Sequence, residues 1–495
     1  MGIKFRLTLM NFLQYAVWGA WLITLGTYCS QTLHFEGGQI ATFYASMGIA
    51  SLFMPAIMGV LADRFIPAQI LLGVCHFLAA FFLIFGASQT EYMPLYISVL
   101  FSVMFYMPTI ALSNSVAFNA LNKANLDTVK AFPPIRVWGT IGFIAAMWFV
   151  SLVMIDVDHA YLSLDQKPSN VKQLIALSNS VEYSAEKPTE VVEIVEEQTE
   201  ATNSEIEENS VEKLTAEFAP KAPMQEVELK SDENAVEQYN TVQMKYTPWQ
   251  FYFSALLSIL LGLFCLTLPA CPVNRHAQSK SWIDTFGLRA FSLFKEPKMA
   301  IFFIFSMLLG MSLQITNAFA DPYITNFGNI AEYAQSAIVK NSTILISLSQ
   351  VSETLCILLI PFFLKRFGIK KVMLISMFAW VFRFGFLGAG DPGAGAWMLI
   401  MSMVVYGVAF DFFNISGSLF VDQETSSDIR SSAQGVFMIM TNGFGAFIGS
   451  FIAGAVVDCF GLTPTSWYIF AGYSFVVAVV FAFVFKYKHN PDAIK

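Results

Sequence analysis

Apolar runs recur along this chain of 495 residues, and each is long enough to cross a lipid bilayer as a helix of about 20 residues. Backbone groups in lipid must satisfy their own hydrogen bonds, so such runs have to be helices packed against one another. The sequence therefore predicts an all-α polytopic membrane protein. Twelve transmembrane helices are expected, near residues 7–28, 40–62, 68–88, 93–118, 136–155, 248–270, 298–322, 340–364, 370–390, 396–420, 431–456 and 465–487.

Short matches at equivalent positions indicate that the twelve helices form two pseudo-symmetric bundles of six. An Arg-Phe pair occurs in Gly59–Phe65, between the second and third helices, and again in Phe363–Lys371, between the eighth and ninth. Arg136 opens the fifth helix and Arg430 the eleventh, each after an isoleucine. Duplicated halves are typical of transporters, whose substrate site lies near the midplane between the repeats.

Lysine and arginine gather at alternate connections and at both termini, whereas the other short connections almost lack them. The basic positions are Lys4 and Arg6, Arg64, Lys123–Arg136, Arg275–Lys298, Lys365–Lys371, Arg430 and Lys486–Lys495. By the positive-inside rule, both termini are expected in the cytoplasm, and an even number of helices agrees with this.

One long connection has a different composition. Residues 156–247 are rich in Glu, Ser, Thr, Gln and Pro, and acidic residues there far outnumber basic ones. The formal net charge of the whole chain, −8, therefore says little about its membrane part. A segment so poor in apolar residues is expected to be mostly disordered, and the topology places it outside the cytoplasm. A solvated insertion without a function is favoured over a docking arm.

The expected domain boundaries follow from these features. Residues 1–155 hold the first five helices, and residues 248–270 form the sixth, which completes the N-terminal bundle. Residues 271–297 form a cytoplasmic link, and residues 298–495 form the C-terminal six-helix bundle.

Polar residues inside membrane helices are costly, and several here share a helical face. Arg136, Thr140 and Phe143 are spaced i, i+4 and i+7 in the stretch Phe132–Phe143, where two prolines are expected to close a polar loop before the fifth helix. An arginine that snorkels to the headgroups, above ordinary packing, explains this stretch alone about equally well.

Further polar faces occur in the C-terminal half and favour a binding cavity over packing alone. Gln314 and Asn317 share a face of the seventh helix, and Gln350 and Glu353 share one of the eighth. The tenth helix carries Tyr406, Phe410 and Asn414 on one face, with Asp411 beside them. His76 and Arg383 are isolated and are interpreted as structural.

Amides, a carboxylate and aromatic rings suit a small, uncharged, hydroxylated solute with a flat ring. A sugar would fit nearly as well, so these residue types leave the substrate open. Glu353 is the first candidate for a proton carrier, because a carboxyl group in an apolar span is tolerated best when protonated. Asp411 is the second candidate, and a carboxylate that only packs helices explains Asp411 equally well.

Several long motifs resemble the bacterial nucleoside permeases, which are nucleoside:proton symporters of the major facilitator superfamily. The resemblance covers nearly the whole chain except the acidic segment. The motifs are Phe132–Phe143, Met299–Gly310, Leu313–Asn317, Ser349–Leu355, Tyr406–Ser418 and Ser432–Gly435.

This resemblance implies the major facilitator fold, the inner membrane of a Gram-negative bacterium, and proton-driven uptake of purine and pyrimidine nucleosides. It also implies a set of nucleoside-contacting residues: Arg136, Thr140, Phe143, Gln314, Asn317, Gln350, Glu353, Tyr406 and Phe410. Two features depart from the family pattern. The acidic segment is additional, and Gly59–Phe65 lacks the later glycine and basic pair of the superfamily's loop signature.

Other classes of function fit the sequence less well. A proton-coupled transporter of a sugar or polyol is the main alternative, and a membrane sensor that binds without transport is a weaker one. An intramembrane enzyme would need a nucleophile with a base or a metal-binding cluster, and no such motif occurs. The six cysteines form no C-x-x-C pair. We therefore expect a monomer in the bilayer that uses nucleoside and protons, with no cofactor, metal or nucleic acid.

Overall fold

The structure is a computed structural model that describes residues 2–153, 155–161, 240–271, 273, 288–426 and 429–487. Within these ranges the chain is helical apart from two short strands, β1 (Ile155–Tyr161) and β2 (Asn240–Tyr246), which pair with each other. The strands border the acidic segment. Most of that segment, and with it the predicted disorder, lies outside the described residues.

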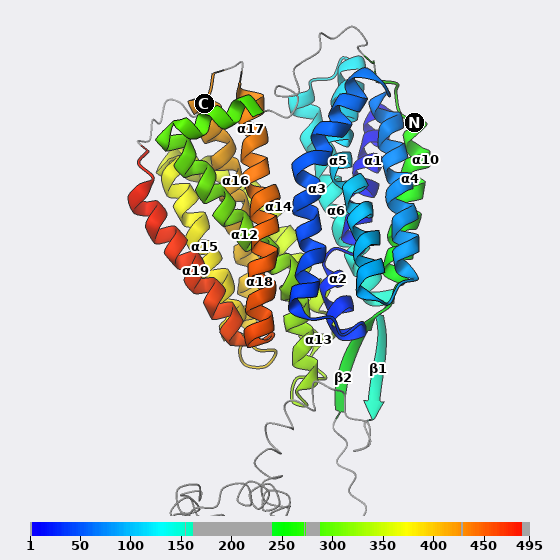
Figure 1. The fold of residues 1–495 in the computed structure, drawn as a ribbon, viewed down its shortest axis with the longest axis vertical. Coiled ribbons are helices and arrows are strands. Elements are labelled where there is room, and N and C mark those ends of the chain that lie inside the picture. The colour runs from blue at the N-terminus through cyan, green and yellow to red at the C-terminus, as the bar shows by residue number, and fades with distance from the viewer. Residues whose placement is uncertain are drawn as a thin grey trace, which may run out of the picture. The chain divides into compact units, whose positions relative to one another are not determined.

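The first half of the chain forms the N-terminal bundle (Figure 1). Within it, α1 packs on α6, α4 on α5 and α10, and α3 on α5. The first membrane pass is interrupted after Gly19 and continues through a short helix and a π-helix. The elements of this half are α1 (Ile3–Gly19), α2 (Thr24–Thr27), η1 (Tyr28–Thr32), α3 (Gly37–Arg64), α4 (Ala68–Ala87), α5 (Tyr92–Lys123), α6 (Thr128–Val153) and α10 (Trp249–Cys265).

The second half forms the C-terminal bundle, in which α15 packs on α16 and α19, α14 on α16, and α12 on α18. The eleventh pass consists of α17 and α18 joined by a π-helical segment, η4. The elements are η2 (Leu288–Lys295), α12 (Pro297–Asn326), η3 (Phe327–Asn329), α13 (Ala337–Lys340), α14 (Ser342–Phe367), α15 (Ile369–Ala389), α16 (Ala396–Glu424), α17 (Arg430–Met438), η4 (Ile439–Gly445), α18 (Ala446–Phe460) and α19 (Pro464–Val484).

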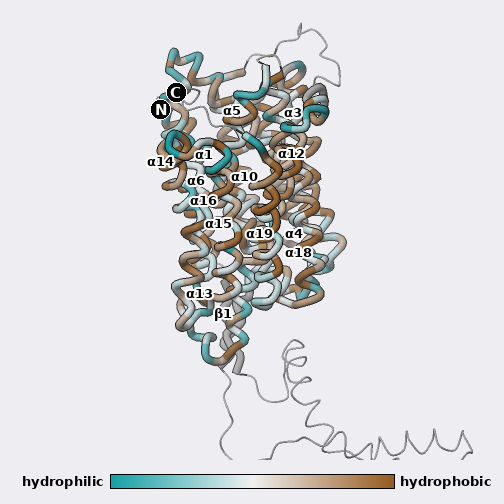
Figure 2. Tube along the Cα trace, turned by 90° about the vertical axis from the view of Figure 1, so that its left-hand side faces the viewer, coloured by the Kyte–Doolittle hydropathy of each residue, from teal (hydrophilic) through white to brown (hydrophobic). Residues whose placement is uncertain are grey.

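Ten helices in the described ranges are long and apolar enough to cross a membrane. The shorter α10, with 17 residues, and the interrupted pass of α1, α2 and η1 complete the twelve helices that the sequence predicts. Apolar residues line the helices, and polar residues gather towards their two ends (Figure 2). This is the distribution expected of a bundle surrounded by lipid, in which lipid-facing side chains are as apolar as those inside.

The fifth pass differs from the prediction at its start. The sequence predicts a loop through Phe132 and two prolines, with the helix beginning at Arg136, but α6 begins at Thr128 and includes Pro133 and Pro134. A proline within a helix removes a backbone hydrogen bond because it has no N–H. Here both prolines lie near the helix start, where few intrahelical bonds precede them. The helix therefore continues through them, and Arg136 lies inside it.

Close approach of α3 to η4 and α18 joins the two bundles over small residues. A methyl group added at Gly454 would lie 2.6 Å from Cβ of Ala41 and 2.9 Å from the carbonyl oxygen of Gly37. One added at Gly48 would lie 2.7 Å from the carbonyl oxygen of Gly443. Glycine at these positions lets the two helix backbones come into direct contact, as is common between membrane helices. We call this contact the glycine seam.

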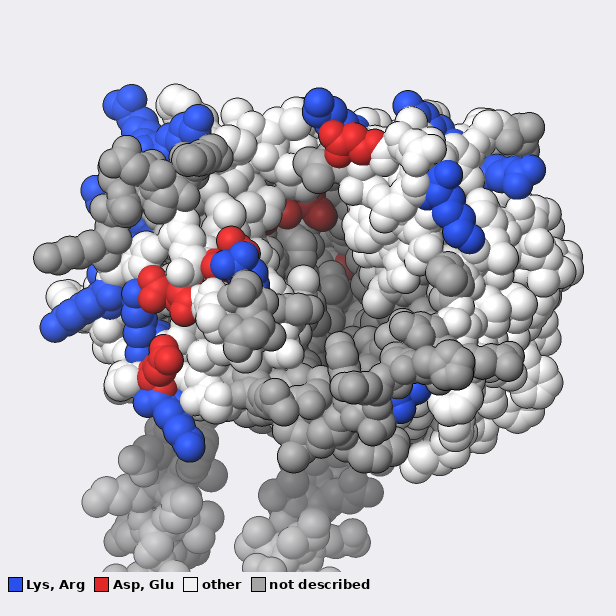
Figure 3. Space-filling model, turned by 90° about the horizontal axis from the view of Figure 1, so that it is seen from above, with Lys and Arg blue, Asp and Glu red and all other residues white. Residues whose placement is uncertain are grey.

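Figure 1 places the start of α1, α17 and the end of α19 at one end of the helices, and α2 and α13 at the other. Seen from the first of these ends, the molecule is hollowed between the bundles, and Lys and Arg side chains lie around the rim (Figure 3). We call this the open end and the opposite one the closed end.

Candidate functional site

A cavity of about 880 Å³ lies between the two bundles and is lined by residues from both. Its size falls within the roughly 300–1,000 Å³ of typical small-molecule sites. The walls are formed by α1, α3, α5 and α6 of the N-terminal bundle and by α12, α14, α16, α17 and η4 of the C-terminal bundle. All nine residues of the predicted binding set lie in these walls: Arg136, Thr140, Phe143, Gln314, Asn317, Gln350, Glu353, Tyr406 and Phe410.

The wall formed by α6 carries the face that its spacing predicts. Arg136, Thr140 and Phe143 all reach the cavity. The guanidinium carbon of Arg136 lies 3.9 Å from the ring centroid of Tyr15 on α1, which is a cation–π contact. Phe143 meets the indole of Trp18 edge to face, with ring centroids 6.3 Å apart. The α6 wall thus combines a cation, a hydroxyl and an aromatic ring.

Amide side chains from α12 and α14 form the opposite wall. Asn317 donates a long hydrogen bond of 3.4 Å to the Oε1 oxygen of its neighbour Gln314. The Oε1 oxygen of Gln350 is buried and has no hydrogen-bond partner in the described part of the protein. Buried polar atoms normally have partners. An unpartnered acceptor in a cavity wall is therefore suited to a donor on a bound solute.

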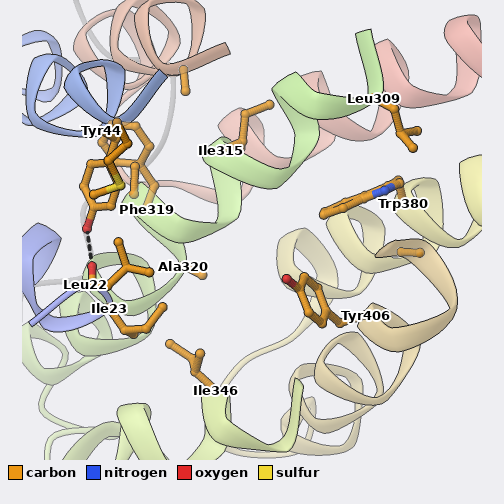
Figure 4. Close-up of a cluster of buried hydrophobic side chains, with 14 of the residues drawn as sticks. Leu22, Ile23, Tyr44, Leu309, Ile315, Phe319, Ala320, Ile346, Trp380 and Tyr406 are labelled. Carbon is orange, nitrogen blue, oxygen red and sulfur yellow. Dashed lines mark hydrogen bonds between the residues drawn. The ribbon is translucent and has the colours of Figure 1, made fainter. Parts of the chain in front are cut away.

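Two aromatic rings complete the wall on α16. The rings of Tyr406 and Phe410 are nearly parallel, at an interplanar angle of 5° and a centroid distance of 5.7 Å. Tyr406 also packs edge to face on Trp380 (Figure 4). The guanidinium carbon of Arg383 lies 4.5 Å from the ring centroid of Tyr406. Trp380 and Arg383 thus hold the Tyr406 ring in place, so the ring offers a preorganised flat surface to a flat ligand.

Asp411 lies apart from the cavity. Its side chain is buried, is absent from the cavity lining, and leaves Oδ2 without a hydrogen-bond partner among the described residues. Asn414, which the sequence places on the face of Tyr406 and Phe410, borders a smaller pocket and donates a hydrogen bond to the carbonyl of Phe410. Glu353 is therefore the carboxylic acid found among the described residues that line the cavity.

His76 and Arg383 have structural partners that the sequence does not reveal. The ring nitrogens of His76 lie 2.8 Å from the hydroxyl of Ser258 and 2.9 Å from Oε1 of Gln14. Arg383 donates a hydrogen bond of 2.8 Å to the carbonyl of Ser402 and another of 3.3 Å to Ser349. These bonds connect helices within one bundle, so the structural interpretation of both residues agrees with the structure.

Sequence reasoning missed Asp321, which is fully buried on α12. Its Oδ2 accepts a hydrogen bond of 2.5 Å from Thr27 on α2, and its Oδ1 accepts one of 2.7 Å from Ser342. The carboxylate thus joins the two bundles at the closed end. Other hydrogen bonds also cross there, among them those from Gln31 to Thr325 (2.8 Å) and from Trp148 to Ser347 (2.9 Å). We call these three bridges the seal.

Aromatic packing surrounds the seal on the cavity side. The hydroxyl of Tyr44 donates a hydrogen bond of 2.9 Å to the carbonyl of Leu22, and Phe319 of α12 lies beside it (Figure 4). Tyr44 also accepts a hydrogen bond from the backbone N–H of Gly26. The buried charge of Asp321 was the available signal in the sequence, because a carboxylate within an apolar span needs a partner.

In the described ranges no group of three or more His, Cys, Asp or Glu residues is placed to hold a metal ion. Two repeated bundles around one polar cavity, open at one end and closed at the other, define a secondary transporter of the major facilitator fold. The crystal structure of a D-xylose–proton symporter shares this fold, with a TM-score of 0.60 at 12% identity over 99% of both chains.

Closer similarities identify the family. The sequence profile of the nucleoside H+ symporter family matches residues 1–185 and 235–490. The chain is 42% identical to the xanthosine permease of Escherichia coli, over 100% of this chain and 99% of that protein. It is 40% identical to the nucleoside permease NupG of the same organism, over 99% and 97%. A crystal structure of NupG matches with a TM-score of 0.75, covering 99% of this chain and 100% of that one. The chain belongs to the nucleoside H+ symporter family.

Proposed function

We propose that this protein takes up nucleosides together with protons by alternating access. The observation that carries the proposal is the placement of nine polar and aromatic side chains, from both bundles, in one cavity between the bundles, which are hollowed apart at the open end (Figure 3). A site between two repeats can face either side of the membrane when one bundle rocks against the other. Membership of the nucleoside H+ symporter family supports nucleosides as the substrate.

The chemistry of the walls fits both parts of a nucleoside. The parallel rings of Tyr406 and Phe410, with Phe143 opposite, suit stacking on a base. Gln314, Asn317 and Gln350 offer amide donors and acceptors that match ribose hydroxyls and base edges. The stacking surfaces accept any flat base, which supports transport of both purine and pyrimidine nucleosides.

Glu353 is the proposed carrier of the transported proton. Among the described residues it is the carboxylic acid in the cavity wall, one helical turn from Gln350. It lies close enough to Arg136, on the opposite bundle, for the two to interact electrostatically. A carboxyl group between the two bundles can be exposed to each side in turn, and its proton then moves with the substrate. Asp411, away from the cavity, is the second candidate.

The arrangement of charge supports a location in the bacterial inner membrane with both termini in the cytoplasm. Lys and Arg surround the open end, so this conformation faces inward. A monomer is the proposed working unit, because the whole cavity is built from one chain. The proposed domain boundaries follow the two bundles, with residues 156–247 as a periplasmic insertion.

Uptake into proteoliposomes tests the proposal. Vesicles that contain the purified chain should accumulate radiolabelled uridine when the outside is acidic, and should not do so without a proton gradient. Excess adenosine should block this uptake, and excess xylose should not. Inhibition by the sugar but not by adenosine would replace nucleosides with a polyol as the substrate. Binding without accumulation would make the protein a sensor.

A further inference from the structure

Arg136 holds a positive charge in the wall of the cavity, and among the described residues no carboxylate lies within ion-pair distance of it, since Glu353 acts on it only at longer range. In the described part of the chain the ion pairs involve other residues, and none joins Arg136 to an acid. A charge within a membrane protein is costly unless other groups stabilise it. The guanidinium carbon of Arg136 lies 3.9 Å from the ring centroid of Tyr15, well within the roughly 6 Å range of a cation–π interaction.

Gly139 makes room for this contact. It follows Arg136 by three residues, so the two lie on the same side of α6. A methyl group at Gly139 would lie 2.6 Å from Cδ2 of Tyr15 and 2.8 Å from Nη1 of Arg136. Such distances are far shorter than a van der Waals contact between carbon atoms. The tyrosine ring and the guanidinium therefore fit together only because position 139 has no side chain.

The other side of α1 is held firmly by a polar network next to Tyr15. Nε2 of Gln14 donates a hydrogen bond of 2.7 Å to Thr109, and Oε1 of Gln14 pairs with His76. The hydroxyl of Tyr106 donates a hydrogen bond of 2.6 Å to the backbone carbonyl of Gln14. These buried bonds come from α4 and α5, so the backbone that carries the Tyr15 ring is fixed on the side away from the cavity.

We infer that Tyr15 is a positioning residue, which holds the guanidinium of Arg136 in the cavity by its flat face. Stacking on a ring uses the face of the guanidinium and leaves its in-plane N–H donors free. A carboxylate partner would occupy these donors and compete with a solute for them. The ring of Tyr15, which fits because Gly139 has no side chain, therefore stabilises the cation and keeps its N–H groups available to hydroxyl or carbonyl groups of the solute.

This inference rests on the proposed function, because it takes the ligand of Arg136 to be the transported nucleoside. Its test is a set of variants of the full chain in nanodiscs, with uridine affinity measured by calorimetry. Tyr15→Leu removes the ring face and should weaken uridine binding by about threefold to thirtyfold, the range of a cation–π contact. Tyr15→Phe keeps the ring and should rescue most of the affinity.

A second comparison tells whether Tyr15 positions Arg136 or contacts the solute directly. Tyr15→Leu should add little to the loss caused by Arg136→Gln, because the ring then has no cation to hold. An equal further loss in the Arg136→Gln background would show that Tyr15 acts on the solute itself and would overturn the inference. If Arg136→Gln binds too weakly to measure, the comparison of Phe with Leu at position 15 decides the question.

Glycine substitutions provide the matched control. Gly139→Ala should weaken uridine binding by at least about threefold, because the methyl group separates ring and guanidinium. Gly385→Ala, in α15, adds the same methyl group where nothing lies within 4 Å, and should leave affinity unchanged. Wild-type chain that fails to bind uridine would refute the proposed function. Normal binding by wild type and by Tyr15→Leu, at equal melting temperatures, would refute this inference alone.

Discussion

The hydroxyl of Thr27 donates a hydrogen bond of 2.5 Å to the carboxylate of Asp321 and so joins α2 of one bundle to α12 of the other. Both groups are buried. A hydrogen bond to a charged group contributes about 1.5–3 kcal/mol, and a two-state equilibrium responds strongly to a difference of that size. The bond joins the two bundles at the closed end, so it stabilises the conformation in which this end is closed.

Thr27→Val should therefore shift the protein away from the conformation in which this end is closed. Valine keeps the shape of threonine but cannot donate the bond. With one spin label on each bundle at the closed end, double electron–electron resonance should report a larger share of long distances between the two labels. Thr42→Val is the control, because the hydroxyl of Thr42 bonds to Gln39 and Tyr92 within the same bundle. An unchanged distance distribution in Thr27→Val would show that the other bridges suffice.

Glu353→Gln should keep uridine binding but lose the coupling of transport to protons. Glutamine keeps the shape and the hydrogen-bonding capacity of the side chain but cannot ionise. The variant should still bind uridine, lose accumulation against a gradient, and lose the pH dependence of uptake. Uridine added to vesicles with a pH-sensitive dye should then move no protons. Continued proton movement in Glu353→Gln, together with its loss in Asp411→Asn, would transfer the coupling role to Asp411.

Phe143→Leu and Phe410→Leu should each weaken uridine binding by about 0.5–1.5 kcal/mol, the contribution of an aromatic contact beyond its buried area. Leucine keeps most of the apolar volume, whereas the flat face is lost. Equilibrium binding to the purified variants measures the effect. Phe382→Leu on α15 is the control, because that ring is 57% exposed on the described surface and lies outside the cavity lining. Equal affinities in all three variants would mean that the two rings only pack.

The acidic segment should be dispensable for transport. Residues 186–234, which the family profile leaves unmatched, can be replaced with a short Gly/Ser linker. Tyr246 should be retained, because its carbonyl accepts a hydrogen bond from Thr32 and its hydroxyl bonds to Thr343 at 2.6 Å. Uridine uptake at matched expression should fall by less than about tenfold, or 1.4 kcal/mol. A greater loss would make the segment part of the mechanism.

Helical spacing predicts well which side chains line the cavity, because a membrane helix leaves little freedom in where its side chains point. Residues three or four apart share a face, and the pairs Gln314–Asn317 and Gln350–Glu353 both reach the cavity. The same geometry explains why Asp411 does not. It follows Phe410 by one residue and is therefore turned about 100° around the helix axis.

Residues whose roles depend on a partner from another helix were not predictable. Tyr15 looks like an ordinary aromatic residue in an apolar helix, and its role depends on Arg136, more than 100 residues away. Asp321 precedes a proline, and the pair suggests the end of a helix. In the structure α12 continues to Asn326, and partners from α2 and α14 surround the carboxylate. Pro133 and Pro134 led to a wrong prediction of where α6 begins, because they too suggest a break in the helix when only the local sequence is considered.

The glycine seam has a consequence for the speed of the conformational change. Most packed helices interlock, because side chains of one fill grooves of the other, and a shift requires them to leave those grooves. The atoms nearest to Gly48 and Gly454 in the neighbouring element are backbone atoms and the Cβ of Ala41, so side chains interlock little at these two points. At these two points the bundles can move past each other without withdrawing side chains from grooves. We therefore expect the glycine seam to add little to the activation barrier to rocking, and the hydrogen bonds of the seal, which must break before the closed end opens, to add more.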